Sequence, residues 1–174
     1  MGVADKFASS AHALGARAAE ARELAAVFER SEMGRRAAAS TRAAREWDFI
    51  ADIGGTLVRG SIDLWFEDEG GLHIVDYKTD AKVHSADYET QLALYAYALE
   101  RALGRRPASA RLHYLRSDRV IEVPLNDAAI SNAIGLIATL RTAQDRLQFP
   151  LNVSEHCRAC PFYRGLCPAT ILNP

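Results

Sequence analysis

Two aspartates and a lysine lie on neighbouring segments with strong strand character, and their side chains suit metal-assisted hydrolysis. Thr56–Phe66 and Leu72–Thr79 are rich in β-branched and aromatic residues at alternating positions, which predicts two strands. The first carries Asp63, and the second carries Asp76 and Lys78. Carboxylates bind hard cations and an ammonium group can act on water or phosphate, so these three residues are the first candidates for a reactive site.

The segment between the strands has the composition of a hairpin turn, and the turn determines which residues face each other. A two-residue turn at Glu69–Gly70 would pair Asp63 with Asp76, whereas one at Gly70–Gly71 would pair Asp63 with Lys78. Either register places the three side chains on one face. On the opposite face of the first strand we expect an apolar set: Val58, Gly60, Ile62, Leu64 and Phe66.

Two carboxylates this close repel each other unless a cation or a proton lies between them. Oxygen ligands from two or three carboxylates, with positions left for water, suit Mg²⁺ or Mn²⁺. The adjacent Lys78 can orient and help to deprotonate an attacking water, or stabilise charge that develops on a phosphate. The alternative is an exposed Asp–Lys ion pair on a sheet face, worth under about 1 kcal/mol.

Three short motifs resemble the RecB family of PD-(D/E)XK nucleases. They are Gly60-Ser-Ile-Asp63, Val75-Asp-Tyr-Lys-Thr79 and Gln91-Leu-Ala-Leu-Tyr95, in that order. Among the members of this family, the sequence is most similar to the C-terminal nuclease domains of the AddA, AddB and RecB helicase-nucleases. CRISPR-associated exonucleases are a second match. The resemblance extends from about Glu46 to Cys167.

The resemblance implies roles for individual residues. It assigns metal ligation to Asp63, Asp76 and the Tyr77 carbonyl, and catalysis to Lys78. It places Gln91 and Tyr95 on a helix after the Asp-x-Lys strand; they are four residues apart and therefore share a face. Gln91 would contact a phosphate or hold Lys78, and Tyr95 would stack or form a hydrogen bond nearby. A further upstream ligand is expected from one of two residues: His12 or Glu46.

The C-terminal tail holds every cysteine of the chain, at Cys157, Cys160 and Cys167. This spacing is typical of a soft-metal site rather than of a disulfide framework. The resemblance implies a [4Fe–4S] cluster, for which the chain has no fourth cysteine. His156 or another chain could supply the last ligand. Zinc is the alternative metal, and a reduced trio that only packs the tail is the alternative without a metal.

The elements that must position these residues alternate in type along the chain. Ala11–Arg45 is predicted to be helical, Arg45–Ile53 to be a strand, and Asp87–Leu103 to be a helix that ends near Gly104. A second hairpin and a last helix capped by Asn126 or Asp127 complete the pattern. We expect an α/β (α+β) fold of the PD-(D/E)XK, restriction-endonuclease-like type, with a mixed central sheet flanked by helices. Three regions are expected: residues 1–45 as a helical segment, 46–149 as the nuclease core, and 150–174 as the cysteine-bearing tail.

Composition narrows the class of protein. The net charge of −1 conceals eleven acidic and three basic residues between Glu46 and Gln91, flanked by basic segments. That distribution fits a carboxylate-lined cation site beside a polyanion track, or simply scattered surface charge. No apolar run is long enough for a membrane helix and Met1–Ser10 lacks a signal-peptide core, which indicates a cytoplasmic protein without a membrane partner.

Two functions of different classes follow. The first is a Mg²⁺- or Mn²⁺-dependent DNA exonuclease domain, which the resemblance connects with DNA end processing, recombination and double-strand-break repair. The chain lacks a Gly-x4-Gly-Lys-Ser/Thr loop, so a helicase motor would belong to another domain or another protein of a complex. The second is a DNA-end-binding module that keeps the fold and cleaves poorly.

Overall fold

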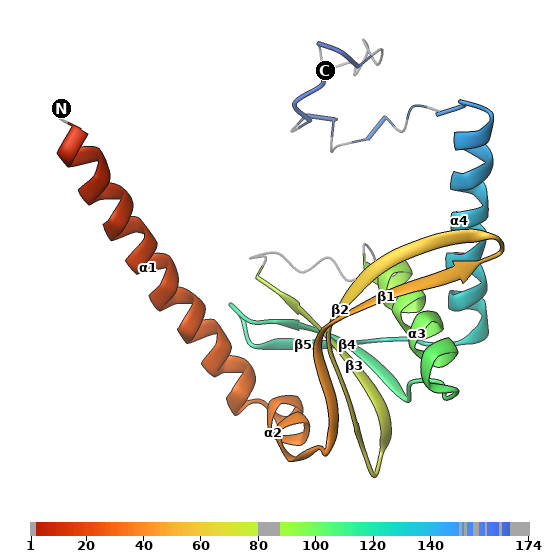
Figure 1. Cartoon of the computed structure of the whole chain (residues 1–174), viewed down its shortest axis with the longest axis horizontal. Coiled ribbons are helices and arrows are strands. Elements are labelled where there is room, and N and C mark those ends of the chain that lie inside the picture. Colours follow the sequence, from red (N-terminus) through yellow and green to blue (C-terminus); the bar gives the residue numbers. More distant parts are fainter. Residues whose placement is uncertain are drawn as a thin grey trace. The chain divides into compact units, whose positions relative to one another are not determined.

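The computed structural model describes residues 3–79 and 88–149, together with positions 151, 153–154, 157–158, 160–163 and 165–167 of the tail. The chain forms two compact units, Met1–Ala138 and Thr139–Pro174, and all five strands belong to the first. The elements in chain order are α1 (Val3–Arg30), α2 (Glu32–Ala39), β1 (Arg42–Ile53), β2 (Thr56–Asp68), β3 (Gly71–Lys78), α3 (Glu89–Leu103), β4 (Ser109–Tyr114), β5 (Arg119–Val123) and α4 (Asp127–Asp145) (Figure 1). The expected α/β fold with a mixed sheet is confirmed.

The sheet has the strand order β1-β2-β3-β4-β5. Neighbouring strands are antiparallel except for β3 and β4, which run parallel. Parallel strands cannot be joined by a tight turn, and the connection between β3 and β4 contains helix α3. The crossover therefore starts directly after the strand that carries Asp76 and Lys78.

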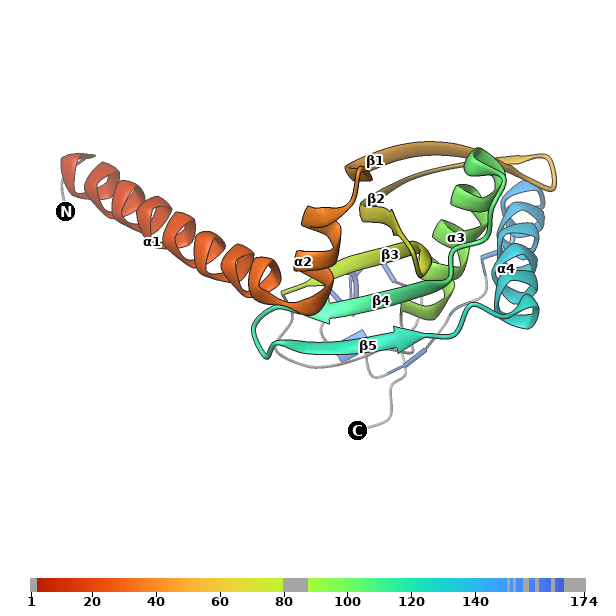
Figure 2. The same ribbon diagram turned by 90° about the horizontal axis from the view of Figure 1, so that it is seen from below.

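Two apolar clusters lie on opposite faces of the sheet. Figure 2 shows the ribbons of the helices that contribute to them, α1 and α2 to one cluster and α3 to the other. Leu72 and Ile74 of β3 pack with Leu92, Ala96 and Leu99 of α3. The intervening side chains of β3 point the other way and pack against the end of α1 and against α2; they are Val75 and Tyr77, which meet Phe28, Met33 and Ala37. Helix α4 packs on α3 through Ile130 and Ala133 against Ala93. The two helical layers thus leave β3 enclosed on both sides.

The N-terminal helical region ends earlier than its composition predicts. The helix expected to reach Arg45 is broken at Ser31, whose hydroxyl accepts a hydrogen bond from the Gly34 backbone N–H at 3.0 Å and caps α2. Strand β1 then begins at Arg42, because Arg42–Arg45 pair with Leu64–Glu67 of β2. Sheet pairing overrides the helix propensity of this Ala- and Arg-rich stretch.

The side-chain alternation of β1 and β2 changes phase at one position. In the register of the two strands Glu46 stands opposite Asp63, and this pair is missing from the ladder of the fully described segment 42–67. Glu46 has φ +48°, in the left-handed region. The expectation that Ile62 shares a face with Leu64 and Phe66 is wrong for this reason. Ile62 packs with Trp65 in the α3-side cluster, whereas Leu64 and Phe66 pack in the other.

Among the described residues, no helix is both long enough and apolar enough to cross a membrane.

Candidate metal centre and nuclease site

The β2–β3 hairpin brings the two central aspartates together. Its turn is at Glu69–Gly70, since Asp68 pairs with Gly71 and Leu64 with Val75. The ladder ends at Leu64–Val75, and the same register continued by one residue would set Asp63 opposite Asp76, one of the two registers that the sequence permits. The Asp63 carboxylate also accepts a hydrogen bond from the backbone N–H of Tyr77 at 2.8 Å. This bond fixes Asp63 across the end of the hairpin, beside the strand that carries the other site residues.

Asp76 is a buried carboxylate that forms an ion pair with Lys78. It is 1% exposed, and its Oδ2 lies 2.7 Å from Lys78 Nζ, the one strong contact of that oxygen among the described residues. Burial raises the pKa of Asp76, and the charge of Asp63 raises it further; the Lys78 ammonium acts in the opposite direction. A carboxylate of this kind is costly to keep ionised, which is the condition that a bound cation relieves.

Helix α3 adds two polar side chains to the same face. Gln91 donates from Nε2 to the Tyr95 hydroxyl at 2.6 Å, and the same nitrogen lies 3.4 Å from Asp76 Oδ1. Its Oε1 accepts from Lys78 Nζ at 3.4 Å. Burial raises the pKa of Tyr95, and the nearby carboxylates contribute, so its phenol stays protonated. Gln91 therefore links the aspartate, the lysine and the tyrosine in one network.

Tyr88 belongs to this group and was not among the residues selected from the sequence. Its ring centroid lies 3.7 Å from Lys78 Nζ, a cation–π contact. The signal was present in the spacing: residues 88, 91 and 95 recur at i, i+3 and i+7, the period of one helix face. Tyr88 immediately precedes α3, where a helical pattern is easily overlooked.

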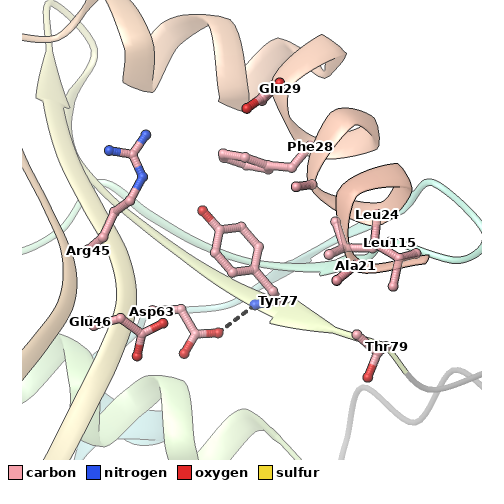
Figure 3. Close-up of a pocket in the computed structure, with 11 residues that line it drawn as sticks. Ala21, Leu24, Phe28, Glu29, Arg45, Glu46, Asp63, Tyr77, Thr79 and Leu115 are labelled. Carbon is pink, nitrogen blue, oxygen red and sulfur yellow. Dashed lines mark hydrogen bonds between the residues drawn. The ribbon is translucent and has the colours of Figure 1, made fainter. Parts of the chain in front are cut away.

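Of the two candidates for an upstream metal ligand, Glu46 has a described side chain and His12 does not. Glu46 lines a pocket together with Asp63, and Figure 3 shows both carboxylates at the same side of it. The positive φ of Glu46 and the missing ladder pair turn the chain at this point. His12 lies in α1 at a position whose side chain is outside the described residues, so its expected role stays a prediction.

The donor set at this face fits a hard divalent cation. Asp63 and Asp76 offer carboxylate oxygens, and the charge of Asp63 is close enough to raise the pKa of Asp76. Within the part of the chain that the structure describes, no three His, Cys, Asp or Glu side chains are gathered as a ligand group. Two carboxylates are nevertheless sufficient for Mg²⁺, which usually keeps several waters and binds through one or two carboxylates plus substrate phosphate.

The two described histidines outside the N-terminal helix, His73 and His113, are buried and contact polar side chains away from Asp76. His73 contacts Ser109 at 2.8 Å, Arg36 at 2.9 Å and Asp68 at 3.1 Å on the face opposite Asp76. His113 is fully buried, 2.9 Å from Asp118. His84 and His156 lie outside the described residues.

The tail belongs to the second unit and is described in part. Backbone hydrogen bonds join Cys160 N–H to the Cys157 carbonyl at 3.3 Å and Cys167 N–H to the Phe162 carbonyl at 2.9 Å. The three cysteines are half-buried and form no disulfide. Their expected metal ligation stays a prediction.

The sequence that forms this hairpin belongs to a longer region that matches a family of known proteins. The model of the PD-(D/E)XK nuclease superfamily matches residues 3–168, nearly the whole chain. The chain belongs to the PD-(D/E)XK nuclease superfamily. Asp76-Tyr77-Lys78 has the residue order Asp-x-Lys, which agrees with the (D/E)XK pattern in the name of the family.

Relatives of this PD-(D/E)XK domain include three proteins named as subunits of an ATP-dependent helicase/nuclease. The protein from Alkaliphilus oremlandii is 38% identical over 73 residues, covering 38% of this chain and 6% of the relative. That from Alkaliphilus metalliredigens is 32% identical over 115 residues, covering 55% and 10%. That from Desulforudis audaxviator is 37% identical over 111 residues, covering 52% and 9%. The matched region is thus a small part of these much longer proteins.

The PD-(D/E)XK fold also has a neighbour among solved structures. A candidate exonuclease from Eubacterium rectale superposes with a TM-score of 0.52 at 17% identity, covering 80% of this chain and 59% of the other. At this identity the likeness supports the fold alone.

Proposed function

We propose that this chain is a divalent-metal-dependent DNA nuclease domain that hydrolyses phosphodiester bonds, with exonuclease action at DNA ends. The observation that carries the proposal is the buried Asp76, whose Oδ2 lies 2.7 Å from Lys78 Nζ and whose pKa is raised by burial and by the charge of the neighbouring Asp63. A structural ion pair alone would not require a second carboxylate near it.

Each residue of the site then has a role. Asp63, Asp76 and the Tyr77 carbonyl would hold Mg²⁺ or Mn²⁺, with Glu46 as the additional acidic ligand; the ion, when bound, supplies Lewis-acid charge for the phosphate. Lys78 orients the attacking water and stabilises the charge that develops on the phosphate. Gln91 and Tyr95 keep Lys78 in place through the hydrogen bonds that they share.

The cellular role is inferred from the relatives. Because they are named helicase/nuclease subunits, we infer that a helicase domain or partner protein delivers DNA to this site, in end processing, recombination and double-strand-break repair. For the tail we propose that Cys157, Cys160 and Cys167 bind a [4Fe–4S] cluster or zinc. Anaerobic reconstitution followed by metal analysis tests this. Protein that contains neither iron nor zinc would count against it.

The decisive experiment is cleavage of end-labelled single- and double-stranded DNA with Mg²⁺, Mn²⁺ or a chelator. We expect metal-dependent cutting by the parent chain and none by Asp76→Asn. Asp48→Asn is the matched control, because Asp48 is an exposed carboxylate on β1. If the parent binds DNA ends but does not cut them with any ion, the DNA-end-binding module is the correct interpretation.

A further inference from the structure

A pocket of about 410 Å³ adjoins the candidate metal centre on the α1 side of the sheet. One wall is formed by helix α1, through residues at i, i+3, i+4 and i+7 that share one helix face: Ala21, Leu24, Ala25 and Phe28. Tyr77 and Leu115 form the sheet side (Figure 3). Its volume is in the range of small-molecule sites in proteins.

The walls of this pocket are apolar and aromatic. The Phe28 and Tyr77 rings meet edge to face, with centroids 4.7 Å apart. In Figure 3 the Tyr77 ring stands in the middle of the pocket, with Phe28 and α1 on one side and the Asp63 and Glu46 carboxylates on the other. Aromatic side chains of this kind stack on nucleic acid bases with little regard to sequence, because every base has a π-face.

The pocket and the proposed metal centre share Asp63 and Glu46. A phosphodiester held by a cation at these carboxylates would have the base of its own or the neighbouring nucleotide at the mouth of the pocket. Arg45 is exposed at the rim and forms no ion pair among the described residues. A guanidinium at this position is suited to a backbone phosphate of the same strand.

We propose that this pocket binds one unpaired base of the strand being cut, and that Phe28, Tyr77 and Arg45 thereby select single-stranded DNA or frayed duplex ends. The proposal rests on the proposed nuclease function and extends it to the substrate. A base within duplex DNA is stacked and paired, and it must leave the stack before it can enter a protein pocket. Intact duplex is then a poor substrate until its end opens.

The test fills the pocket without altering the metal centre. Ala25 is exposed yet lines the pocket, so Ala25→Leu reduces the space without adding an aromatic ring. Ala19→Leu is the matched control, because Ala19 is an exposed alanine of the same helix on the opposite face. Thermal melting of both variants checks that the fold is intact.

Binding is measured with a single-stranded oligonucleotide that carries 2-aminopurine near its end, in Ca²⁺ so that a cation is present at the carboxylates, and a gel verifies that the oligonucleotide stays intact. We expect fluorescence quenching with the parent and with Ala19→Leu, and at least about fivefold weaker binding with Ala25→Leu. An abasic site in place of the probe base should weaken binding to the parent by a similar factor. In a cleavage assay with Mg²⁺, the same changes should raise KM more than they lower kcat.

Each outcome is informative about the pocket. No quenching, or equal affinity of Ala25→Leu and Ala19→Leu, overturns the proposal even if the parent cuts DNA. Equal cutting of blunt duplex and single strands, without any effect of the abasic site, also overturns it. If base-dependent binding is found but no divalent ion supports cutting, the pocket stands and the nuclease function fails.

Discussion

Glu46 stands opposite Asp63 at the one position of the described β1–β2 hairpin where the ladder lacks a pair between Arg42 and Ile53. The positive φ of Glu46 is uncommon for a residue other than glycine and places a second carboxylate beside Asp63. Strain of this kind persists where the surrounding structure imposes it, and it is often found at functional sites.

This relationship predicts that the Glu46 side chain contributes to metal binding. Glu46→Gly suits the left-handed backbone and should retain the fold while weakening Mn²⁺ binding, which calorimetry measures. Glu46→Gln should weaken binding as well, because it removes the charge and keeps the shape. Unchanged Mn²⁺ affinity in both variants would show that Glu46 is not a ligand; Asp48→Asn serves as the control.

Substitutions of Asp76 and Lys78 should change different properties: metal binding for Asp76, and the cleavage rate alone for Lys78. Asp76→Ala removes a ligand and should abolish both Mn²⁺ binding and cleavage. Lys78→Ala should bind Mn²⁺ normally and cut about 10²- to 10⁴-fold more slowly, the usual loss for a positioned acid–base group. Gln91→Ala should have a smaller effect, since Gln91 supports Lys78 rather than the metal. A Mn²⁺ affinity unaffected by Asp76→Ala contradicts the two-carboxylate site.

Tyr88 is expected to position Lys78 through the cation–π contact of its ring. Tyr88→Phe should therefore retain the cleavage rate, and Tyr88→Leu should lower kcat by about 3- to 30-fold, as the loss of a cation–π contact of about 0.5–2 kcal/mol implies. Calorimetry should show the same Mn²⁺ affinity in both variants. Equal kcat in the two variants would show that the ring does not support Lys78.

Metal binding should depend on pH because the pKa of Asp76 is raised. The carboxylate must be ionised to hold a cation, so affinity is fully present above the raised pKa and is lost as pH falls through it. We expect the apparent midpoint for Mn²⁺ binding to lie above the ordinary aspartate value of 3.8. Titrations of Mn²⁺ at a series of pH values test this, and a midpoint at or below 3.8 would contradict it.

Arg36 should stabilise the fold through its two hydrogen bonds to Asp68, at 2.7 and 3.1 Å. Arg36→Ala is expected to lower the unfolding free energy by about 2 kcal/mol, whereas Arg42→Ala, which breaks an exposed pair with Glu67, should cost under about 1 kcal/mol. Urea denaturation at neutral pH compares them. A loss for Arg36→Ala no larger than that for Arg42→Ala would contradict the assignment.

The Arg36–Asp68 pair should also make the unfolding free energy depend on pH, in a direction that the lowered pKa of Asp68 determines. Arg36 holds the pKa of Asp68 well below its usual range, so the stabilisation is present above the unfolded value of 3.8 and is lost as pH falls through the lower folded pKa. The difference in unfolding free energy between the parent and Arg36→Ala should therefore narrow as pH falls below 3.8. A difference that stays constant at acid pH would show that another interaction of Arg36 is responsible.

The β2–β3 hairpin could be predicted from the sequence, whereas the backbone at Glu46 and the start of β1 could not. Strand period and turn composition are local, and they predicted the β2–β3 hairpin, with a turn at Glu69–Gly70 as one of two choices. That Asp63 shares a face with Asp76 and Lys78 stays a prediction. The phase change at Asp63 could not be predicted, because it depends on a left-handed backbone at Glu46 that alternation does not reveal. The Ala-rich stretch before Trp47 was misjudged for a related reason: long-range pairing with β2 overrides local propensity.

Helix α3 contributes to the hydrophobic core with one face and to the proposed site with another, and the residues of the two faces are neighbours in the sequence. Leu92, Ala96 and Leu99 are fully buried in the core, while Gln91 and Tyr95 hold the proposed catalytic lysine. A larger residue at Ala96 has no space and would move the helix, and with it the hydrogen bonds to Lys78. A substitution in the core face of α3 should therefore also move the side chains that contact Lys78. We expect that such a substitution seldom improves packing without changing activity. Natural variation should accordingly be narrower along this helix than on the exposed surface of the β1–β2 hairpin.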